Sequence, residues 1–318
     1  PSGSFKKFQI EEPKIHGKSK IMGDAIRMAD KVAPSQVNVL LIGDQGTSKE
    51  LLSKRIHCRS LRKKEAFITV DCSIMNDGQI ERELFGQDEQ PGLCELVHGG
   101  TLLLKNISQL SISLQAKIHR LISEKLARKV DSQVSYDCDV RIIATNHVDL
   151  KEKVIEGRFR EDLFYSLNTF SIQIPSLKQR GEDIDILANH FLSQGRNKFE
   201  QKSFSEQALG LLREYTWPGN VRELQNIVER AHILSEGMII EKKHLIDCVA
   251  ENEREEGQVE SEIDFTEMTL DELEKRHICL TLDHLSGNKT KTAKTLGITV
   301  KTLYNKLHNY GMVAAKEA

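Results

Sequence analysis

The chain has 318 residues, of which 39% are hydrophobic and 29% are charged. This length and composition exclude a mini-protein and a fully disordered chain, and they predict two or three domains with hydrophobic cores. The 45 Lys and Arg residues nearly balance 47 Asp and Glu residues, for a net charge of −2. No global charge draws the molecule to nucleic acid or membrane, so any binding to nucleic acid must be local.

No apolar run approaches the roughly 18 to 20 residues of a membrane-spanning helix, and we expect a cytoplasmic protein with no membrane partner. The six cysteines lack the pairwise spacing of a metal site, which indicates reduced thiols and no bound metal. The chain begins with Pro1 rather than Met, so we expect a further N-terminal domain ahead of this segment.

Short apolar runs alternate with helical stretches in the first half of the chain. Most of these runs lack polar alternation, as do strands that are buried on both faces. They predict an α/β domain over residues 10–176, with a parallel sheet and crossover helices. The expected strands are residues 37–42, 67–70, 101–104, 140–144 and 170–174.

The pattern changes after Pro175, which ends the last expected strand. Residues 177–250 carry apolar side chains at helical intervals and predict a small all-α domain. Residues 251–265 are rich in charge and poor in apolar side chains, which predicts a linker. Residues 266–318 are expected to form a third, short helical unit.

A loop at residues 43–50 connects the first expected strand to a helix that begins near Leu51. Such a loop directs backbone N–H groups and the positive end of the helix dipole toward phosphate, and Lys49 can reach the β- and γ-phosphate oxygens. An ordinary strand-turn-helix corner is the alternative. The phosphate-loop pattern has Gly and a hydroxyl where this chain has Ser48 and Glu50. The candidate nucleotide-binding residues of the loop are Gly43, Gly46, Thr47, Ser48, Lys49 and Glu50.

This loop resembles the G-E-x-G-T-G-K-E loop of the AAA+ domain in bacterial enhancer-binding transcription regulators, the sigma-54 activator family. In that family Glu follows the Lys, so Glu50 fits the family and Ser48 departs from it. The resemblance implies an AAA+ α/β subdomain, a helical lid and a Fis-type helix-turn-helix domain. Further family motifs follow in the same order, at residues 83–86, 99–104, 114–117, 139–146, 157–163 and 217–226.

The residues after the expected strand at 101–104 depart from the family. The family has Asp and Glu there, to hold Mg²⁺ and to activate the attacking water, whereas this chain has Lys105 and Asn106. Because an amide cannot accept a proton at neutral pH, we expect a weakened Mg²⁺ site and weak or no ATP hydrolysis. Two interpretations of Lys105 stay open: its ammonium compensates phosphate charge in place of the metal, or it is a solvated or salt-bridged Lys at a decayed site.

Other catalytic positions of the family are matched. The resemblance assigns Asn146 to the sensor that orients the γ-phosphate and Arg222 to the second sensor, which the lid carries. Arg158 and Arg160 lie where the family has an arginine finger directed at a neighbour's nucleotide, and surface arginines are the alternative. The family usually has a further Arg after Tyr165, and its absence here makes a dimer at least as consistent as a hexameric ring.

Active family members carry a G-A-F-T-G-A loop that engages sigma-54, and the interval 87–98 has no match to it and is too short to hold it. The resemblance therefore implies a regulator that works without sigma-54. The combination is similar to a divergent branch of biofilm regulators, including VpsR, that bind cyclic di-GMP. The basic run at residues 59–64 is either a contact for the phosphates of that ligand or a solvated helix end.

Residues 287–310 contain five Lys and no Asp or Glu, a local positive charge that predicts DNA as the partner. Gly297 is expected to form the turn between two helices and Thr299 to cap the second, which is a helix-turn-helix pattern; three helices for protein contact are the alternative. The preceding helix, over residues 270–280, is either a dimer face or part of the core. The candidates for the major groove are Lys301, Thr302, Asn305 and Lys306, and those for DNA phosphate are Lys289, Thr290 and Lys291.

Together these patterns predict a sequence-specific DNA-binding transcription regulator whose degenerate AAA+ domain binds ATP or ADP, and also cyclic di-GMP, to control assembly and DNA binding. Its expected partners are double-stranded promoter DNA, RNA polymerase and further copies of the chain. One alternative is an active ATPase that remodels RNA polymerase, in which Glu50, Asp71 or Asp139 replaces the missing carboxylates. The other is an architectural DNA-binding protein, whose oligomer size would not respond to nucleotide.

Overall fold

The computed structural model describes residues 10–87, 89–194, 202–246, 248, 274–275, 277–278, 281–282 and 288–310. Contacts divide the chain into two compact units, Pro1–Ala250 and Glu251–Ala318. The expected linker at 251–265 and most of the expected helix at 270–280 lie outside the described residues.

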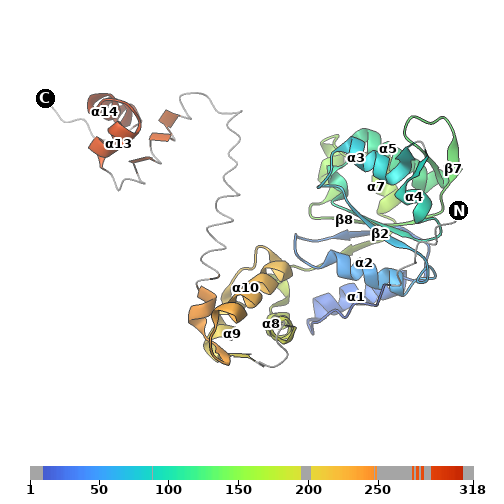
Figure 1. Cartoon of the computed structure of the whole chain (residues 1–318), viewed down its shortest axis with the longest axis horizontal. Helices are drawn as coiled ribbons and strands as arrows, with labels where there is room; N and C mark the ends of the chain where they lie inside the picture. Colours follow the sequence, from blue (N-terminus) through green and yellow to red (C-terminus); the bar gives the residue numbers. More distant parts are fainter. Residues whose placement is uncertain are drawn as a thin grey trace. The chain divides into compact units, whose positions relative to one another are not determined.

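A five-stranded sheet forms the centre of the first unit, with all strands parallel and the order β2-β5-β8-β1-β9 (Figure 1). Its strands begin and end within two residues of the expected positions, and the predicted α/β fold is confirmed. The strands are β1 (Val39–Ile42), β2 (Phe67–Asp71), β5 (Thr101–Lys105), β8 (Arg141–Asn146) and β9 (Ser171–Gln173).

Helices cover both faces of this sheet (Figure 1). In β1, Val39 and Leu41 join the core on the face of α1 and α2, whereas Leu40 joins the core on the opposite face. Successive side chains of a strand point to opposite faces of the sheet. Because helices cover both faces here, apolar residues occupy successive positions of the strands. The helices are α1 (Lys20–Val32), α2 (Lys49–Cys58), α3 (Asp77–Phe85), α4 (Leu93–Leu96), α5 (Ile112–Glu124), α6 (Leu150–Ile155) and α7 (Glu161–Leu167).

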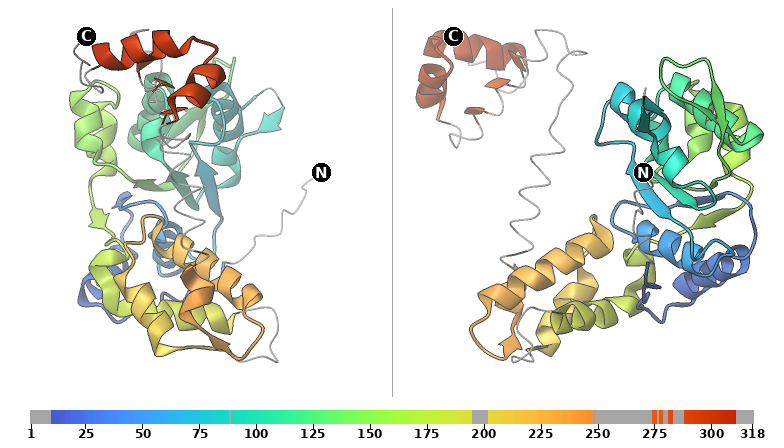
Figure 2. Two further views of the ribbon diagram at one scale, coloured as in Figure 1. Left: turned by 90° about the vertical axis from the view of Figure 1, so that its left-hand side faces the viewer. Right: turned by 45° about the vertical axis from the view of Figure 1, so that its right-hand side comes forward.

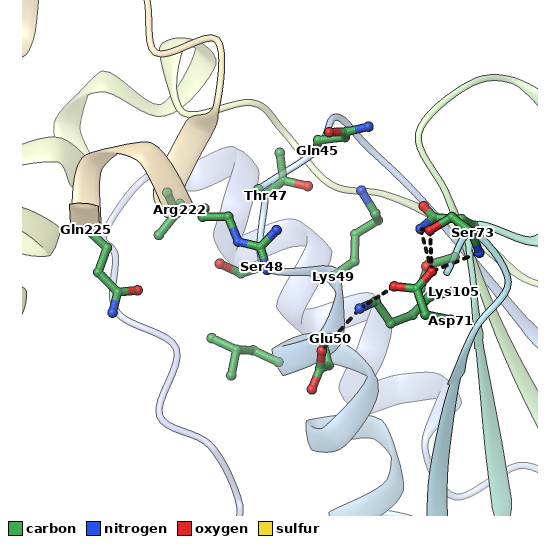
Figure 3. Close-up of a pocket in the computed structure, with 15 residues that line it drawn as sticks. Gln45, Thr47, Ser48, Lys49, Glu50, Asp71, Ser73, Lys105, Arg222 and Gln225 are labelled. Carbon is green, nitrogen blue, oxygen red and sulfur yellow. Dashed lines mark hydrogen bonds and ion pairs between the residues drawn. The ribbon is translucent and has the colours of Figure 1, made fainter. Parts of the chain in front are cut away.

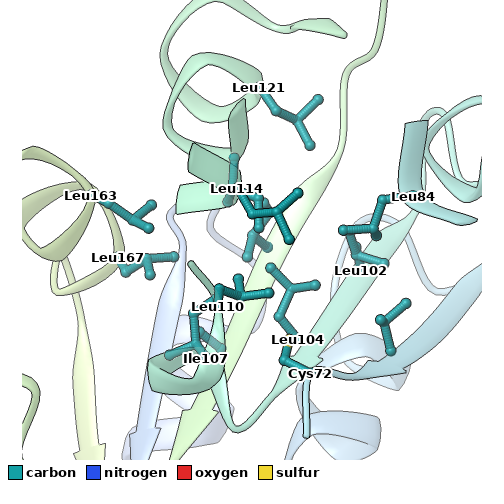
Figure 4. Close-up of a cluster of buried hydrophobic side chains, with 14 of the residues drawn as sticks. Cys72, Leu84, Leu102, Leu104, Ile107, Leu110, Leu114, Leu121, Leu163 and Leu167 are labelled. Carbon is teal, nitrogen blue, oxygen red and sulfur yellow. The ribbon is translucent and has the colours of Figure 1, made fainter. Parts of the chain in front are cut away.

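The larger of the two cores lies between the sheet and the helices α3, α5 and α7 (Figure 4). Leu102 and Leu104 point from β5 into it, toward Leu114 of α5 and Leu163 of α7. This core fixes β5, so the residues that follow Leu104 start from a rigid strand end.

Arg141, at the start of β8, is a buried cation with only 1% of its surface exposed. Its guanidinium donates hydrogen bonds to the carbonyl oxygens of Ala33 (2.7 Å), Val32 (3.0 Å) and Val37 (3.1 Å). The last carbonyls of a helix have no partner within the helix, so Arg141 satisfies the end of α1. Burial, together with the charge of Arg62, lowers the pKa of Arg141 to about 10, which still leaves it charged at neutral pH. Arg141 thereby ties α1 to the sheet.

The lid follows β9 and is helical, as predicted, with one short pair of parallel strands added. Trp217 lies in its core with 1% of its surface exposed, and its indole N–H donates to the carbonyl of Leu212 at 2.8 Å. Figure 2 shows the lid elements, drawn yellow-green to orange, gathered in one body. They are α8 (Ile184–Ser193), α9 (Glu206–Glu214), α10 (Asn220–Leu234), β10 (Ser203–Phe204) and β11 (Ile239–Ile240), preceded by the 3₁₀ turn η2 (Lys178–Asp183).

The second unit contains α13 (Lys289–Thr295) and α14 (Val300–Asn309), which pack on each other. Gly297 has a φ of +67°, and the side chain of Thr299 accepts a hydrogen bond from the N–H of Thr302 at 3.1 Å. The predicted turn and cap of the helix-turn-helix are therefore confirmed. No helix within the described ranges has both the length and the apolar character needed to span a membrane.

Candidate functional site

A cavity of about 570 Å³ opens above the loop between β1 and α2 (Figure 3). The loop backbone bends through the left-handed region at Gly46 (φ +74°) and again at Ser48 (φ +69°). Gly adopts this region freely, but a side chain there is strained, so Ser48 holds a conformation that suits Gly. The turn nevertheless aims the first N–H groups of α2 at the cavity, as a phosphate loop does. The residues that line it are Gln45, Gly46, Thr47, Ser48, Lys49, Glu50, Leu51, Asp71, Ser73, Lys105, Asn106, Thr145, Val221, Arg222 and Gln225.

Lys49 lies against the loop that precedes it. Its ammonium donates to the backbone carbonyls of Gly43 and, at 2.7 Å, of Asp44. Burial lowers its pKa to about 8, with a further lowering from the charge of Lys105 and an opposing effect of Asp44. Phosphate oxygens would offset both the cost of burying the Lys49 ammonium and its repulsion by Lys105. The geometry therefore favours an anionic ligand here.

The ends of β2 and β5 place a second cation in the cavity. The ammonium of Lys105 lies 2.9 Å from Asp71 Oδ2 and 3.9 Å from Glu50 Oε2, and Asn106 Nδ2 donates to Asp71 Oδ1 at 3.0 Å. Burial favours the neutral form of Asp71, but hydrogen bonds from Ser73, Lys105 and Asn106 outweigh it and hold the pKa of Asp71 well below its usual range. Asp71 is therefore a poor proton acceptor.

The expectation that Asp139 could replace the missing carboxylates is wrong. Asp139 precedes β8, so it lies at the amino end of the parallel sheet, whereas the cavity lies at the carboxyl end. Its carboxylate pairs with Arg62 at 2.8 Å and with Lys125 at 2.9 Å. Of the three acids considered, only Glu50 and Asp71 line the cavity.

The lid closes one side of the cavity through α10. Arg222 and Gln225 extend from α10, opposite Lys105 and Asp71 (Figure 3). The contact between lid and loop is made largely by main-chain atoms: the N–H of Val221 donates to the carbonyl of Gly46 at 3.1 Å, and Asn220 Nδ2 donates to the carbonyl of Gln45 at 2.9 Å. The structure thus brings Arg222 to the phosphate loop. Sequence reasoning missed Val221 and Gln225, which precede and follow Arg222 on the same helix.

Asn146 does not line the cavity, although it ends the strand next to β1. Its side chain is fully buried. Its Oδ1 accepts from Ser108 Oγ at 2.8 Å, and its Nδ2 donates to the carbonyl of Val148 at 2.9 Å. Both ends of the amide are occupied within the chain, so it reaches a nucleotide only after these bonds rearrange.

Arg158 and Arg160 also lie outside the cavity lining. Buried Gln115 holds this segment: its Oε1 accepts from the N–H of Arg160 at 2.8 Å and its Nε2 donates to the carbonyl of Arg158 at 3.1 Å. The side chain of Arg160 pairs with Asp162 at 2.7 Å, and the side chain of Arg158 is 74% exposed. Neither arginine meets this chain's own nucleotide cavity, and their action on a neighbouring copy stays a prediction.

Much of the basic run at 59–64 is used in ion pairs within the chain. Arg59 pairs with Glu12 at 2.7 Å and with Asp30 at 2.8 Å, and Arg62 pairs with Asp139. The run follows the last turn of α2, whose first turn faces the cavity, so the length of that helix separates the two. Lys63 and Lys64 line a separate, small hollow.

In the interval that we expected to be too short for a sigma-54 contact loop, the chain forms a short antiparallel hairpin, β3 (Gly86–Gln87) and β4 (Gln90–Pro91), followed by α4. Gly86 has a φ of +79°, and an added Cβ on it would lie 2.6 Å from the carbonyl oxygen of Gln90. The two strands therefore pack closely at the base of the hairpin, where only Gly fits at position 86.

The exposed face of α14 carries Lys301, Tyr304 and Asn305. Lys306, which we expected on this face, is instead half-buried and pairs with Glu274 at 2.6 Å, and Thr302 is half-buried beside Thr299. Tyr304 was missed from sequence; its ring lies 4.5 Å from the ammonium of Lys289, which connects the two helices on this side. Thr290 and Lys291 are exposed at the start of α13.

Comparison with known proteins covers nearly the whole chain. A family model described as a sigma-54 interaction domain matches residues 15–173, an AAA+ ATPase lid domain matches 178–262, and a Fis-family bacterial regulatory protein matches 269–310.

Two relatives and one solved structure illustrate the match. The transcriptional regulatory protein ZraR of Escherichia coli K12 is 41% identical over 302 residues, and the regulatory protein AtoC of the same strain is 38% identical over 309 residues; each match covers 92% of this chain and 67% of the relative. NtrX from Brucella abortus, solved in complex with ADP, is 28% identical with a TM-score of 0.71, over 94% of this chain and 70% of NtrX. The chain therefore belongs to the sigma-54 activator family of AAA+ transcription regulators with a Fis-type helix-turn-helix domain.

Proposed function

We propose that this chain is a sequence-specific DNA-binding transcription regulator whose AAA+ domain binds ATP or ADP without efficient turnover, and that occupancy controls self-assembly and DNA binding. One observation supports it most directly: the phosphate loop, Lys49 and Arg222 surround one cavity, while Lys105 and Asn106 stand at the strand end where carboxylates are needed. Loss of a general base alone costs about 10² to 10⁴ in rate. Such a site retains the groups that bind nucleotide but lacks those that catalyse ATP hydrolysis.

An active ATPase that remodels RNA polymerase is the second candidate, because Asp71 places one carboxylate on the cavity wall. Four donors, the N–H and hydroxyl of Ser73, the amide of Asn106 and the ammonium of Lys105, already bind this carboxylate and hold its pKa well below the usual range. A base in this arrangement must give up its hydrogen bonds before it accepts a proton from water. Asp71 therefore supports slow turnover at most.

Phosphate release at saturating ATP and Mg²⁺ tests the proposal, with Lys49→Ala as the control for contaminating activity. We expect release from the native chain to equal that of the control. Light scattering with and without ATP then separates a ligand-responsive regulator, whose oligomer size changes, from an architectural protein, whose size does not. Release that depends on Lys49 would establish the ATPase instead.

The short hairpin of β3 and β4 supports regulation without sigma-54. Transcription in vitro from a bound promoter is expected with polymerase that carries the housekeeping sigma factor. A requirement for the sigma-54 holoenzyme would contradict this part of the proposal.

Cyclic di-GMP stays a proposed second ligand, supported by the likeness to cyclic di-GMP-binding regulators. A competition experiment with ATP locates its site. Cyclic di-GMP that binds in the cavity displaces ATP, whereas cyclic di-GMP that binds at Lys63 and Lys64 does not.

Nucleotide affinity is expected to fall as pH rises through 8. The lowered pKa of Lys49, about 8, means that its ammonium loses its proton in this range in the free protein. The bound form needs the charge, so binding above this pH requires uptake of a proton. We expect the dissociation constant for ATP to rise about fivefold from pH 8 to pH 9. Calorimetric titration measures it, and Lys49→Arg, which stays charged, should remove the pH dependence.

Substitutions on the exposed face of α14 are expected to weaken specific DNA binding. Lys301→Ala and Asn305→Ala should each raise the dissociation constant about tenfold or more, because one base contact is worth about 1 to 3 kcal/mol. Fluorescence anisotropy measures it on a duplex enriched from random sequence by the native chain. Lys31→Ala, an exposed change on α1, is the control and should bind as the native chain does. Equal binding by all three variants would place the DNA-reading face elsewhere.

A further inference from the structure

The family implies Mg²⁺ beside the nucleotide, and the cavity residues do not fit this ion. Mg²⁺ needs oxygen ligands in near-octahedral geometry, commonly one or two carboxylates with water and phosphate. The two acidic side chains on the cavity wall, Glu50 and Asp71, both face the ammonium of Lys105. Asp71 Oδ1 already accepts from Ser73 and Asn106. Nowhere in the described part of the chain do three His, Cys, Asp or Glu side chains gather as a metal site.

We propose that this cavity binds ATP or ADP as the metal-free polyphosphate, with the ammonium of Lys105 supplying the positive charge that Mg²⁺ supplies elsewhere. This inference rests on the proposed nucleotide binding and specifies the form of the ligand. It chooses between the two interpretations of Lys105 that the sequence left open.

The arrangement of charges suits a bare polyphosphate. Lys49 comes from α2, Lys105 from the end of β5 and Arg222 from the lid, so three cations approach the cavity from three elements (Figure 3). Against them stand the carboxylates of Glu50 and Asp71, which leaves an excess of one positive charge. A Lys ammonium is a compact charge with three donors and binds phosphate oxygens well.

Asp71 has a positioning role in this arrangement. Its Oδ1 is fixed by Ser73 Oγ (2.6 Å) and Asn106 Nδ2 (3.0 Å), which leaves Oδ2 to hold the ammonium of Lys105. Lys105 is therefore directed into the cavity before ligand arrives. It is close enough to Lys49 to lower the pKa of that residue, so the two ammonium groups act on the same space. A divalent ion added there would meet this repulsion and would have to displace Lys105 from Asp71.

Calorimetric titration of the whole chain with ATP, once with EDTA and once with excess Mg²⁺, tests the inference. We expect binding in EDTA at least as tight as binding with Mg²⁺. Lys105→Asp should weaken binding in EDTA at least tenfold and should make Mg²⁺ strengthen binding at least tenfold. Lys105→Met should weaken binding in both buffers, and Lys31→Asp, the same charge change on an exposed residue in the last turn of α1, should alter neither.

The outcomes separate the two proposals. ATP binding that requires Mg²⁺ would overturn the metal-free form and leave nucleotide binding in place. No binding in either buffer, with a chain that unfolds cooperatively, would overturn the proposed nucleotide binding as well. Unchanged affinity and metal dependence in Lys105→Asp would show that Lys105 is only a salt-bridged surface residue.

Discussion

Arg141→Met is expected to lower the free energy of unfolding of the first unit by about 2 kcal/mol or more. The change removes the donor to the carbonyls of Ala33 and Val37, whereas the carbonyl of Val32 still accepts from Ser35, and each unsatisfied buried group costs about 1 to 3 kcal/mol. Met fills a similar volume, so the loss comes from hydrogen bonds rather than from a cavity. Urea denaturation followed by the fluorescence of Trp217, the single tryptophan, measures it.

Arg128→Met is the matched control, because Arg128 lies exposed on the short strand β6 (Leu126–Arg128), which pairs with β7 (Ser135–Asp137). It should change stability by less than about 0.5 kcal/mol. An equally small effect of Arg141→Met would show that water reaches the end of α1 and that the guanidinium is dispensable.

The double substitution Lys105→Asp with Asn106→Glu is expected to raise phosphate release at least about 100-fold above the native chain. The change supplies the carboxylates that hold metal and activate water, and a general base alone is worth about 10² to 10⁴ in rate. It also removes Lys105 from Asp71. Phosphate release at saturating ATP and Mg²⁺ measures the gain, and the further change Lys49→Ala should abolish it.

Folding of this variant needs its own check. Asn106 has a φ of +54°, a region that Asn tolerates better than Glu, so some stability is lost on substitution. Thermal unfolding shows whether the variant is native at the assay temperature. A folded variant that binds ATP and shows no gain would mean that the strained Ser48 or the inward-turned Asn146, rather than the missing carboxylates, prevents turnover.

The strands and the phosphate loop could be predicted from sequence because each depends on a local pattern. Buried parallel strands need apolar runs, and β1 and β5 have them. The loop needs Gly at a position of positive φ, and Gly46 marks it. The turn of the helix-turn-helix is local as well, since Gly297 and the cap Thr299 lie two residues apart.

Side-chain partners could not be predicted, because they depend on which strands are neighbours. The pairing of Lys105 with Asp71 follows from the adjacency of β5 and β2, which no local pattern encodes. Likewise Lys306 faces Glu274, which lies 32 residues away in the sequence. The position of Asn146 was assigned by resemblance, and resemblance fixes the place of a residue in the chain but not the direction of its amide.

The hydrogen bonds between the phosphate loop and the lid have a consequence for how this protein tolerates mutation. One joins two main-chain groups, at Gly46 and Val221, and the other has a main-chain acceptor at Gln45. Backbone groups are present whatever the side chains are, provided the loop keeps its path. A conformational change that passes from ligand to lid through these bonds therefore depends little on which side chains the catalytic centre carries. Substitutions there can remove ATP hydrolysis and still leave the loop coupled to the lid.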